Sequence, residues 1–387
     1  MRRFLLRWIL IVLSYGLGTA VLAQPVSDKH IAAGFFQSVF VDKNGTVWAW
    51  GRSRLSPEVN ELLPARVMEN GQSAFAHQGV GASFVIKKDQ SLWGWGRTWN
   101  GELGIILPAG SFVHKPRQIL PKVIAVAGEN TLFAIKPDGS LWTWGSFGKQ
   151  RGDRVTKETT RPRKVMDHVV QVSASDSHTL ALDKHGVLWS WGDNPCGALG
   201  TGDTKDHVKP VKVNLKPLGQ RKVVKIATRY TESFLLADDG TVWSWGEPNV
   251  FRPYCIAPPR WVPTQIDTID QVSDMAIGRL FKIYLKKDGS VWLSSYVLHP
   301  DNFLKTCQKN PCKITDDVVE IAAGQWHFLV LKKDGTVWGW GDNEFGQLGD
   351  GTTETRREPV QVRFDLKPEE LPPDQPQPSA IPCMSSR

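Results

Sequence analysis

Residues 334–341 read Asp-Gly-Thr-Val-Trp-Gly-Trp-Gly, an Asp-Gly pair followed by a strand-forming segment that contains two tryptophans. Asp-Gly between two apolar runs is a strong hairpin signal, because both residues tolerate the positive φ of a tight turn. The two Trp are two residues apart, so their side chains lie on the same side of a strand. The segment therefore predicts a β-hairpin whose second strand carries a pair of Trp side chains.

Versions of this segment occur seven times. The first Trp of each copy is Trp48, Trp93, Trp142, Trp189, Trp243, Trp292 or Trp338, at steps of 45, 49, 47, 54, 49 and 46 residues. The second is Trp50, Trp95, Trp144, Trp191, Trp245 or Trp340, and the sixth copy has Ser294 instead. Thirteen of the 17 Trp thus belong to a repeat, which is typical of a stacked or radial array. We interpret them as structural core residues.

Each repeat contains three further parts. An apolar strand precedes the Asp-Gly turn, a Gly-rich loop such as Gly-Gln-Leu-Gly at 346–349 follows the Trp pair, and a Pro-x-x-Val or Pro-x-x-Ile element ends the unit. A four-stranded antiparallel unit repeated seven times closes radially as a propeller, and closure leaves no long unpaired edge. We predict an all-β, seven-bladed β-propeller over residues 24–364, with an open β-solenoid as the alternative.

The two ends of the chain differ in composition from the repeats. Residues 1–23 combine a basic start, an apolar run and small residues up to Ala23, which is typical of a secretory signal peptide cleaved near Ala23. An uncleaved membrane anchor is the alternative. Residues 365–387 are Pro-rich and are expected to be disordered. We expect a secreted or periplasmic protein without stable membrane insertion after cleavage, and its five Cys suit an oxidising compartment.

The seventh repeat carries the most complete pattern, with Ala-x-Gly-x-x-His at 322–327, the Asp-Gly segment, Gly-Gln-Leu-Gly and Pro-x-x-Val at 359–362. This combination resembles the regulator of chromosome condensation repeat family over roughly residues 30–362. A WD repeat fits less well, because x-Trp-Gly and not Asp follows the Trp. The resemblance implies a seven-bladed propeller. The family includes guanine-nucleotide exchange factors for small GTPases and secreted bacterial inhibitors of β-lactamases, and the export signal favours an exported bacterial-type member.

Repeats five and six depart from the pattern in the segments that follow their Trp residues. Aromatic and basic side chains gather there, and such residues dominate protein interfaces. The candidate partner-binding residues are Phe251, Arg252, Tyr254, Trp261 and Tyr296, together with Trp99 and Trp326, which lie outside the Trp repeat. The alternative is that these are degenerate blades whose loops pack on themselves. Cys307 and Cys312 could form a local disulfide, with Cys255 as a competing partner.

The sequence contains no recognisable catalytic motif: no phosphate-binding glycine fingerprint, Gly-x-Ser-x-Gly elbow or His-Glu-x-x-His. His178 and His327 occupy one repeat position and are expected to be structural, and we predict no metal or cofactor. We expect a monomeric, non-enzymatic recognition scaffold that binds a protein partner through blade loops, with an inhibitor-like role, and no nucleic acid.

Three alternatives remain open at this stage. The first is a propeller that binds carbohydrate or cell wall, which would require the paired Trp to be exposed in a groove. The second is a regulator that resembles guanine-nucleotide exchange factors. The third is an enzyme whose site is assembled from distant loops.

Overall fold

The computed structural model of the protein describes most of the repeat region. The described residues are 29–52, 60–77, 79, 81–98, 101–105, 107–108, 111–129, 131–145, 151–152, 159–246, 260–266, 269–279, 281–295 and 311–365. The expected signal peptide and Pro-rich tail lie outside these residues, apart from Asp365. Within them, no helix is long and apolar enough to cross a membrane.

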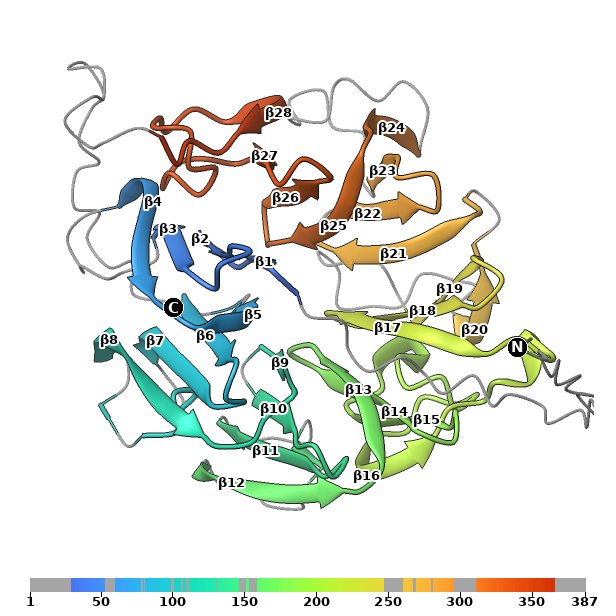
Figure 1. The fold of residues 1–387 in the computed structure, drawn as a ribbon. Helices are drawn as coiled ribbons and strands as arrows, with labels where there is room; N and C mark the ends of the chain where they lie inside the picture. Colours follow the sequence, from blue (N-terminus) through green and yellow to red (C-terminus); the bar gives the residue numbers. More distant parts are fainter. Residues whose placement is uncertain are drawn as a thin grey trace, which may run out of the picture.

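Seven antiparallel sheets, each of four consecutive strands, form a ring (Figure 1). The first three blades are β1 (Ile31–Ala33), β2 (Gln37–Val41), β3 (Val47–Gly51), β4 (Glu61–Met68); β5 (Gly71–Ala76), β6 (Ala82–Lys87), β7 (Leu92–Thr98), β8 (Ser111–Leu120); and β9 (Ala125–Gly128), β10 (Thr131–Ile135), β11 (Leu141–Gly145), β12 (Thr159–Met166). We refer to the four strands of a blade as A to D, from the centre of the ring outward.

The remaining four blades follow the same order. They are β13 (Val169–Ala174), β14 (His178–Asp183), β15 (Leu188–Gly192), β16 (His207–Lys212); β17 (Val223–Arg229), β18 (Glu232–Ala237), β19 (Val242–Gly246), β20 (Arg260–Gln265); β21 (Val272–Ile277), β22 (Phe281–Lys286), β23 (Val291–Ser295), β24 (Cys312–Thr315); and β25 (Val318–Ala323), β26 (His327–Lys332), β27 (Val337–Gly341), β28 (Arg356–Gln361). Two short 3-10 helices, η2 (Pro195–Gly197) and η3 (Lys216–Leu218), lie in the fourth blade and after it. The predicted seven-bladed all-β propeller is confirmed.

The Asp-Gly turns join strands B and C and satisfy their own polar groups. In the seventh blade the Asp334 carboxylate accepts the backbone N–H and hydroxyl of Thr336 at 2.9 and 2.7 Å, and the Thr336 Oγ1 accepts the indole N–H of Trp338 at 2.9 Å. Four other blades repeat this arrangement with Ser or Thr. The first and fourth blades lack the turn Asp, and there Asp42 and Asp183 accept the indole N–H directly. The side-chain bonds of this arrangement stay within one blade, whereas turn carbonyls such as those of Gly45 and Gly139 accept the first strand N–H of the next blade.

The second Trp of each pair packs between neighbouring blades. Trp50, Trp144 and Trp245 are fully buried and donate their indole N–H at 2.8–2.9 Å to a carbonyl in the C–D loop of the preceding blade. The Gly-rich loop makes this approach possible: a Cβ on Gly349, which has φ +65°, would lie 2.8 Å from the Trp50 Nε1. The second Trp of each pair is buried, and the first is half-buried or buried, so no repeat Trp is exposed in the described structure.

The repeat position of His178 and His327 joins each blade to the next. The His178 Nε2 lies 2.6 Å from the Ser233 Oγ, and the His327 Nε2 lies 2.9 Å from the Ser38 Oγ. Burial lowers the pKa of His178 to about 4 and that of His327 to about 3, so both imidazoles are neutral near pH 7. The sequence interpretation of this His as a structural residue agrees with these contacts.

Other blade pairs use different chemistry at the same position. Glu232 forms a 3.5 Å ion pair with Lys282, and the rings of Phe281 and Phe328 are 3.8 Å apart between centroids. In each case, the residue at the repeat position of His178 contacts a residue of the next blade. That residue occupies the repeat position of Ser233 and Ser38. At these four interfaces the side chains at the two positions are therefore chemically matched.

The ring closes between complete blades, because strands β1 and β25 are neighbours and neither blade borrows a strand from the other. The Glu320 carboxylate accepts the backbone N–H groups of His30 and Ile31 at 2.9 and 3.0 Å. The Lys29 ammonium lies 2.7 Å from Asp274, which also pairs with Lys225. These contacts hold the start of the first blade against the inner strands.

The outer D strands are open sheet edges, which invite pairing with other chains. Pro and Lys or Arg discourage that pairing: β8 and β12 each contain one Pro and at least two basic residues, with no acidic residue. This chemistry explains the Pro-x-x-Val element and part of the excess of positive charge.

Candidate functional site

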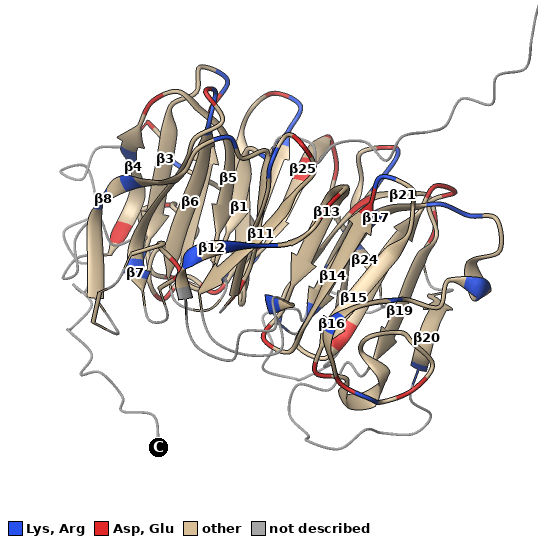
Figure 2. Ribbon diagram, turned by 90° about the horizontal axis from the view of Figure 1, so that it is seen from below, with Lys and Arg blue, Asp and Glu red and all other residues tan. Residues whose placement is uncertain are grey.

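The antiparallel strand order brings two sets of connections to one end of every blade. In the register of the fifth blade, Arg229 of β17 lies opposite Glu232 of β18, Glu232 lies opposite Gly246 of β19, and Gly246 lies opposite Arg260 of β20. The A–B turn and the C–D loop are therefore at the same end of the blade. We call this end of the ring the A–B face and the opposite end the Asp-Gly face. The turns of the Asp-Gly face carry both acidic and basic residues along the upper edge of Figure 2.

The A–B turns surround the centre of the ring and are chemically unlike one another. From the first blade to the seventh they present Phe35 and Phe36, His77, Glu129, Asp176, Tyr230 beside Arg229, Arg279, and Gln325 with Trp326. No two turns among these described residues carry the same set of side chains. Such variation at one position of an otherwise regular repeat marks these turns as the candidate site.

Backbone hydrogen bonds hold several of these turns together. Gln325 N donates to the Gly34 carbonyl at 3.1 Å, Phe35 N to the His77 carbonyl at 3.3 Å, and Arg279 N to the Gln325 carbonyl at 3.2 Å. These bonds connect the sixth, seventh, first and second blades in order. The side chains of these four blades are therefore mounted on a connected row of turns.

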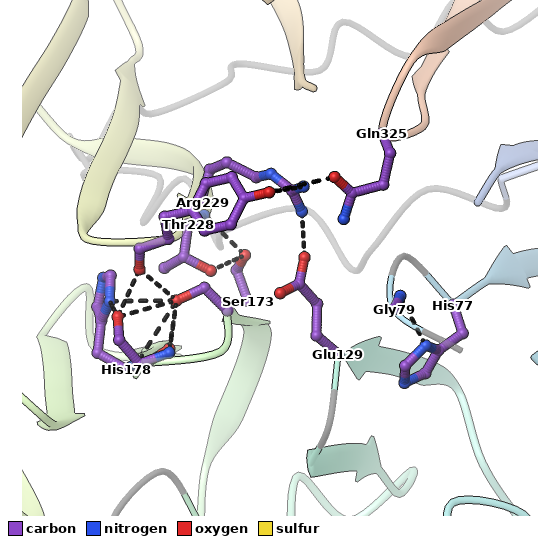
Figure 3. Close-up of polar contacts among 11 residues, drawn as sticks. His77, Gly79, Glu129, Ser173, His178, Thr228, Arg229 and Gln325 are labelled. Carbon is purple, nitrogen blue, oxygen red and sulfur yellow. Dashed lines mark hydrogen bonds and ion pairs between the residues drawn. The ribbon is translucent and has the colours of Figure 1, made fainter. Parts of the chain in front are cut away.

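A buried ion pair crosses the site (Figure 3). Glu129 of the third blade pairs with Arg229 of the fifth, and both side chains are almost fully buried. The Arg229 Nη2 donates to the Tyr230 hydroxyl at 3.3 Å, and that hydroxyl donates to the Gln325 Oε1 at 3.2 Å. One polar chain thus links blades three, five and seven.

Glu129 holds its proton unusually tightly. Burial raises its pKa to about 8, the nearby Asp176 carboxylate adds to the effect, and Arg229 opposes it. Asp176 is exposed and supplies a negative charge beside this pair.

Arg279, in the sixth blade, has a different environment from Arg229. Its guanidinium carbon lies 4.7 Å from the Trp326 ring centroid and 5.9 Å from that of Tyr230. The side chain is half-buried, and its Nε is buried without a hydrogen-bond partner. No carboxylate among the described residues pairs with it. This guanidinium is a cation held by aromatic rings alone.

The histidines at this face are structural. His77 is buried, burial lowers its pKa, and its Nδ1 accepts the Gly79 N–H at 2.9 Å (Figure 3). His178 contacts Ser175 and Ser177, whose hydroxyls donate to the Tyr230 carbonyl and so join blades four and five. No group of three His, Cys, Asp or Glu within the described residues could hold a metal ion.

The structure places two of the seven predicted partner-binding residues. Trp326 lies on the A–B face against Arg279, whereas Trp261 lies on the outer strand β20 with 43% of its surface exposed. They belong to different blades and do not form one patch. Trp99, Phe251, Arg252, Tyr254 and Tyr296 lie outside the described residues.

Cys196 and Cys312 are both disulfide-bonded. Cys307, predicted as the partner of Cys312, lies outside the described residues, so that pairing stays a prediction. Cys196 was not assigned to a disulfide from the sequence.

Sequence reasoning missed the cluster of Glu129, Arg229, Tyr230 and Arg279. Glu129 and Arg229 are 100 positions apart, and no local motif connects them. The available signal was the repeat itself: with the units aligned, the residues before the His position differ in every blade. Reading the repeat for what varies, and not for what recurs, would have located the site.

Comparison with known proteins identifies repeats of a known family in parts of the chain. Two models described as regulator of chromosome condensation (RCC1) repeat match this chain, one at residues 169–198 and 318–347 and the other at 185–231 and 334–368. The chain therefore contains RCC1 repeats, as the sequence resemblance implied.

Curated relatives with this repeat include regulators and ligases. The chain is 26% identical over 356 residues to human E3 ubiquitin-protein ligase HERC2, an alignment that covers 82% of this chain and 7% of the ligase. It is 25% identical over 255 residues to the mitochondrial RCC1 domain-containing protein RUG3 of Arabidopsis thaliana, with coverage of 59% and 57%. The chain spans less than two thirds of the length of either relative.

Solved structures agree on the fold. Human WBSCR16 superposes with a TM-score of 0.67 at 22% identity, covering 79% of this chain and 86% of that one. Prp20p from Saccharomyces cerevisiae, whose structure is described with its binding to Gsp1p and histones, gives 0.69 at 19% identity, with coverage of 84% and 88%. The protein is an RCC1-like propeller, and proteins of this kind typically mediate protein interactions or act as regulators.

Proposed function

We propose that this RCC1-like propeller is an exported, non-enzymatic recognition scaffold that binds one protein partner through its A–B face. The observation that carries the proposal is the variation of the A–B turns on a framework that is otherwise repeated. Aromatic and arginine side chains are enriched among the residues that dominate binding energy. Phe35, Phe36, Tyr230, Arg279 and Trp326 concentrate them around the centre of one face.

Two features support export. The first residues have the composition of a signal peptide, and the disulfides of Cys196 and Cys312 suit an oxidising compartment. The test is sequencing of the amino terminus of the protein recovered from culture fluid or envelope. A new terminus at Gln24 is the expected result, and an intact Met1 would contradict cleavage.

The test of the recognition role is affinity capture from the native envelope or culture fluid, with the mature chain as bait. We expect one protein in stoichiometric amount. Recovery of polysaccharide alone would contradict the proposal. If the captured protein is an enzyme, its activity measured with and without the propeller would show whether the scaffold has the inhibitor-like role that we propose.

Burial argues against the carbohydrate-binding alternative in its original form. That alternative required the paired Trp to be exposed in a groove. The second Trp of each pair is buried, and the first is half-buried or buried, with its indole N–H bonded to a side chain of its own turn. The Lys136 ammonium, for example, lies 4.2 Å from the centroid of the Trp142 ring. Sugar binding would need other aromatic residues, of which Trp261 is exposed.

Ligase or exchange activity does not follow from the relatives. The alignment with the ubiquitin ligase covers 7% of its length, and the likeness to Prp20p establishes the fold alone. A guanine-nucleotide exchange role stays an alternative, and nucleotide release from a captured GTPase would be the measurement that favours it.

A further inference from the structure

Two arginines lie in neighbouring A–B turns, and only one has an acidic partner within the described structure. Arg229 is buried against Glu129, and Asp176 lies close by. Arg279, one blade further on, has no such partner. The fold can therefore supply a carboxylate to an arginine at this face, and in the sixth blade it does not.

The Arg279 side chain is nevertheless held in place. Its backbone N–H donates to the Gln325 carbonyl, and its guanidinium lies against the Trp326 and Tyr230 rings. Tyr230 is itself fixed, because its hydroxyl bonds to Arg229 on one side and to Gln325 on the other. Stacking orients the planar guanidinium but satisfies none of its N–H groups.

A guanidinium held in this way matches a carboxylate. Its parallel N–H groups bind both oxygens of a carboxylate at once, and a partly desolvated site strengthens that interaction. Glu129, the buried acidic side chain of this cluster, is already paired with Arg229. Lys282, the next cation in this blade, is already paired with Glu232.

We propose that Arg279, with the rings of Tyr230 and Trp326, forms a carboxylate-binding site that receives the side chain of an Asp or Glu from the partner protein. This inference rests on the proposed function, because it names the residue of the A–B face that anchors the partner. Binding forms two N–H···O bonds and breaks no covalent bond.

The first experiment needs no identified partner. The probe is N-acetylglutamic acid α-amide, which has a side-chain carboxylate and no other charge, and the control is N-acetylglutamine amide. Modification of arginines by phenylglyoxal is followed by peptide mass spectrometry of the full mature chain. We expect the glutamate probe to slow modification of Arg279 several-fold, while exposed Arg117 on β8 is unaffected and the glutamine control has no effect.

Equal rates with the glutamate and glutamine probes would overturn the inference. So would stronger protection by inorganic phosphate at the same ionic strength, because the site would then be selective for phosphate. Stronger protection by N-acetylglycine would also contradict it, since that result assigns the site to a chain terminus.

The second experiment uses the captured partner. Arg279→Gln should weaken binding by about 30-fold or more, as expected of an interface hot spot. Arg279→Lys should also weaken it, since an ammonium lacks the planar fork. Arg117→Gln is the matched control and should change nothing. If the wild-type chain captures a partner and Arg279→Gln binds it equally well, the inference fails and the proposed function stands. If nothing is captured, the proposed function fails and the probe experiment still decides the site.

Discussion

The two faces of the propeller are built from the same strands but differ in how their turns are satisfied. On the Asp-Gly face, five of the seven turns repeat one arrangement of Asp, Ser or Thr, and Trp, and the side-chain bonds of this arrangement stay within one blade. On the A–B face, the turns differ from blade to blade and bond across the ring, as Glu129 and Arg229 do. Recurrence marks what every blade needs in order to fold, and variation marks what one molecule needs in order to bind.

The largest predicted effect lies in the repeated framework. Trp50→Ala removes a fully buried side chain and its bond to the Gln347 carbonyl. We expect the free energy of unfolding to fall by about 3–5 kcal/mol, as for other large-to-small changes in cores. Urea denaturation followed by circular dichroism measures it. At temperatures where the variant is folded, we expect it to bind the partner normally. Loss of binding by the folded variant would contradict the assignment of Trp50 to the framework alone.

An inter-blade contact offers the next test. Lys282→Ala leaves the buried Glu232 carboxylate without its cation, at an expected cost of about 3 kcal/mol in unfolding free energy. The double variant Glu232→His with Lys282→Ser copies the His178 and Ser233 pair of the preceding interface. It should recover most of the loss. A double variant as unstable as the single one would contradict the idea that the two positions are matched.

These two predictions also separate what the sequence could establish from what it could not. The Trp pairs, the Asp-Gly turns and the structural His were readable because each recurs at a fixed spacing. Arg229 and Glu129 meet across the ring, Arg279 and Trp326 meet between two neighbouring blades, and each of these residues occurs once at its position. Single occurrences have no periodicity, so the predicted partner-binding residues were drawn from unusual loops. Of the two that the structure describes, Trp326 lies in the central cluster and Trp261 does not.

The pH dependence of stability should report on the A–B face. The folded pKa of Glu129 is raised to about 8 by burial, from 4.5. Its contribution to stability is therefore complete below the unfolded pKa and is lost as the pH rises through 8. We expect Glu129→Gln to remove this loss. Urea denaturation of both proteins between pH 6 and pH 9 provides the measurement, and parallel profiles would count against a protonated Glu129.

The histidines of the framework should act in the opposite direction. His178 and His327 have folded pKa values of about 4 and about 3, so their contribution is present above the unfolded pKa, near 6.5, and is lost as the pH falls. His327→Gln should lessen acid destabilisation between pH 6 and pH 4. If the free energy of unfolding of the variant falls as steeply as that of the wild type between pH 6 and pH 4, other groups dominate the acid destabilisation.

The smallest expected effect on stability comes from the segment that connects β19 and β20 in the sequence. Arg252→Ala with Tyr254→Ala alters the aromatic and basic segment that the sequence singled out, and it should weaken partner capture without lowering the midpoint of thermal unfolding. Unchanged capture would confine recognition to the central turns. Loss of capture equal to that of Arg279→Gln would extend the binding site from the centre of the A–B face outward.

Site-specific photo-crosslinking tests most directly whether the partner binds the A–B face. A photo-crosslinking amino acid is placed at Trp326 on the A–B face or at Lys333 on the Asp-Gly face, and the mature protein is illuminated in its native envelope or culture fluid. We predict a crosslinked partner band from position 326 and none from position 333. A band from position 333 alone would contradict the assignment of function to the varied face.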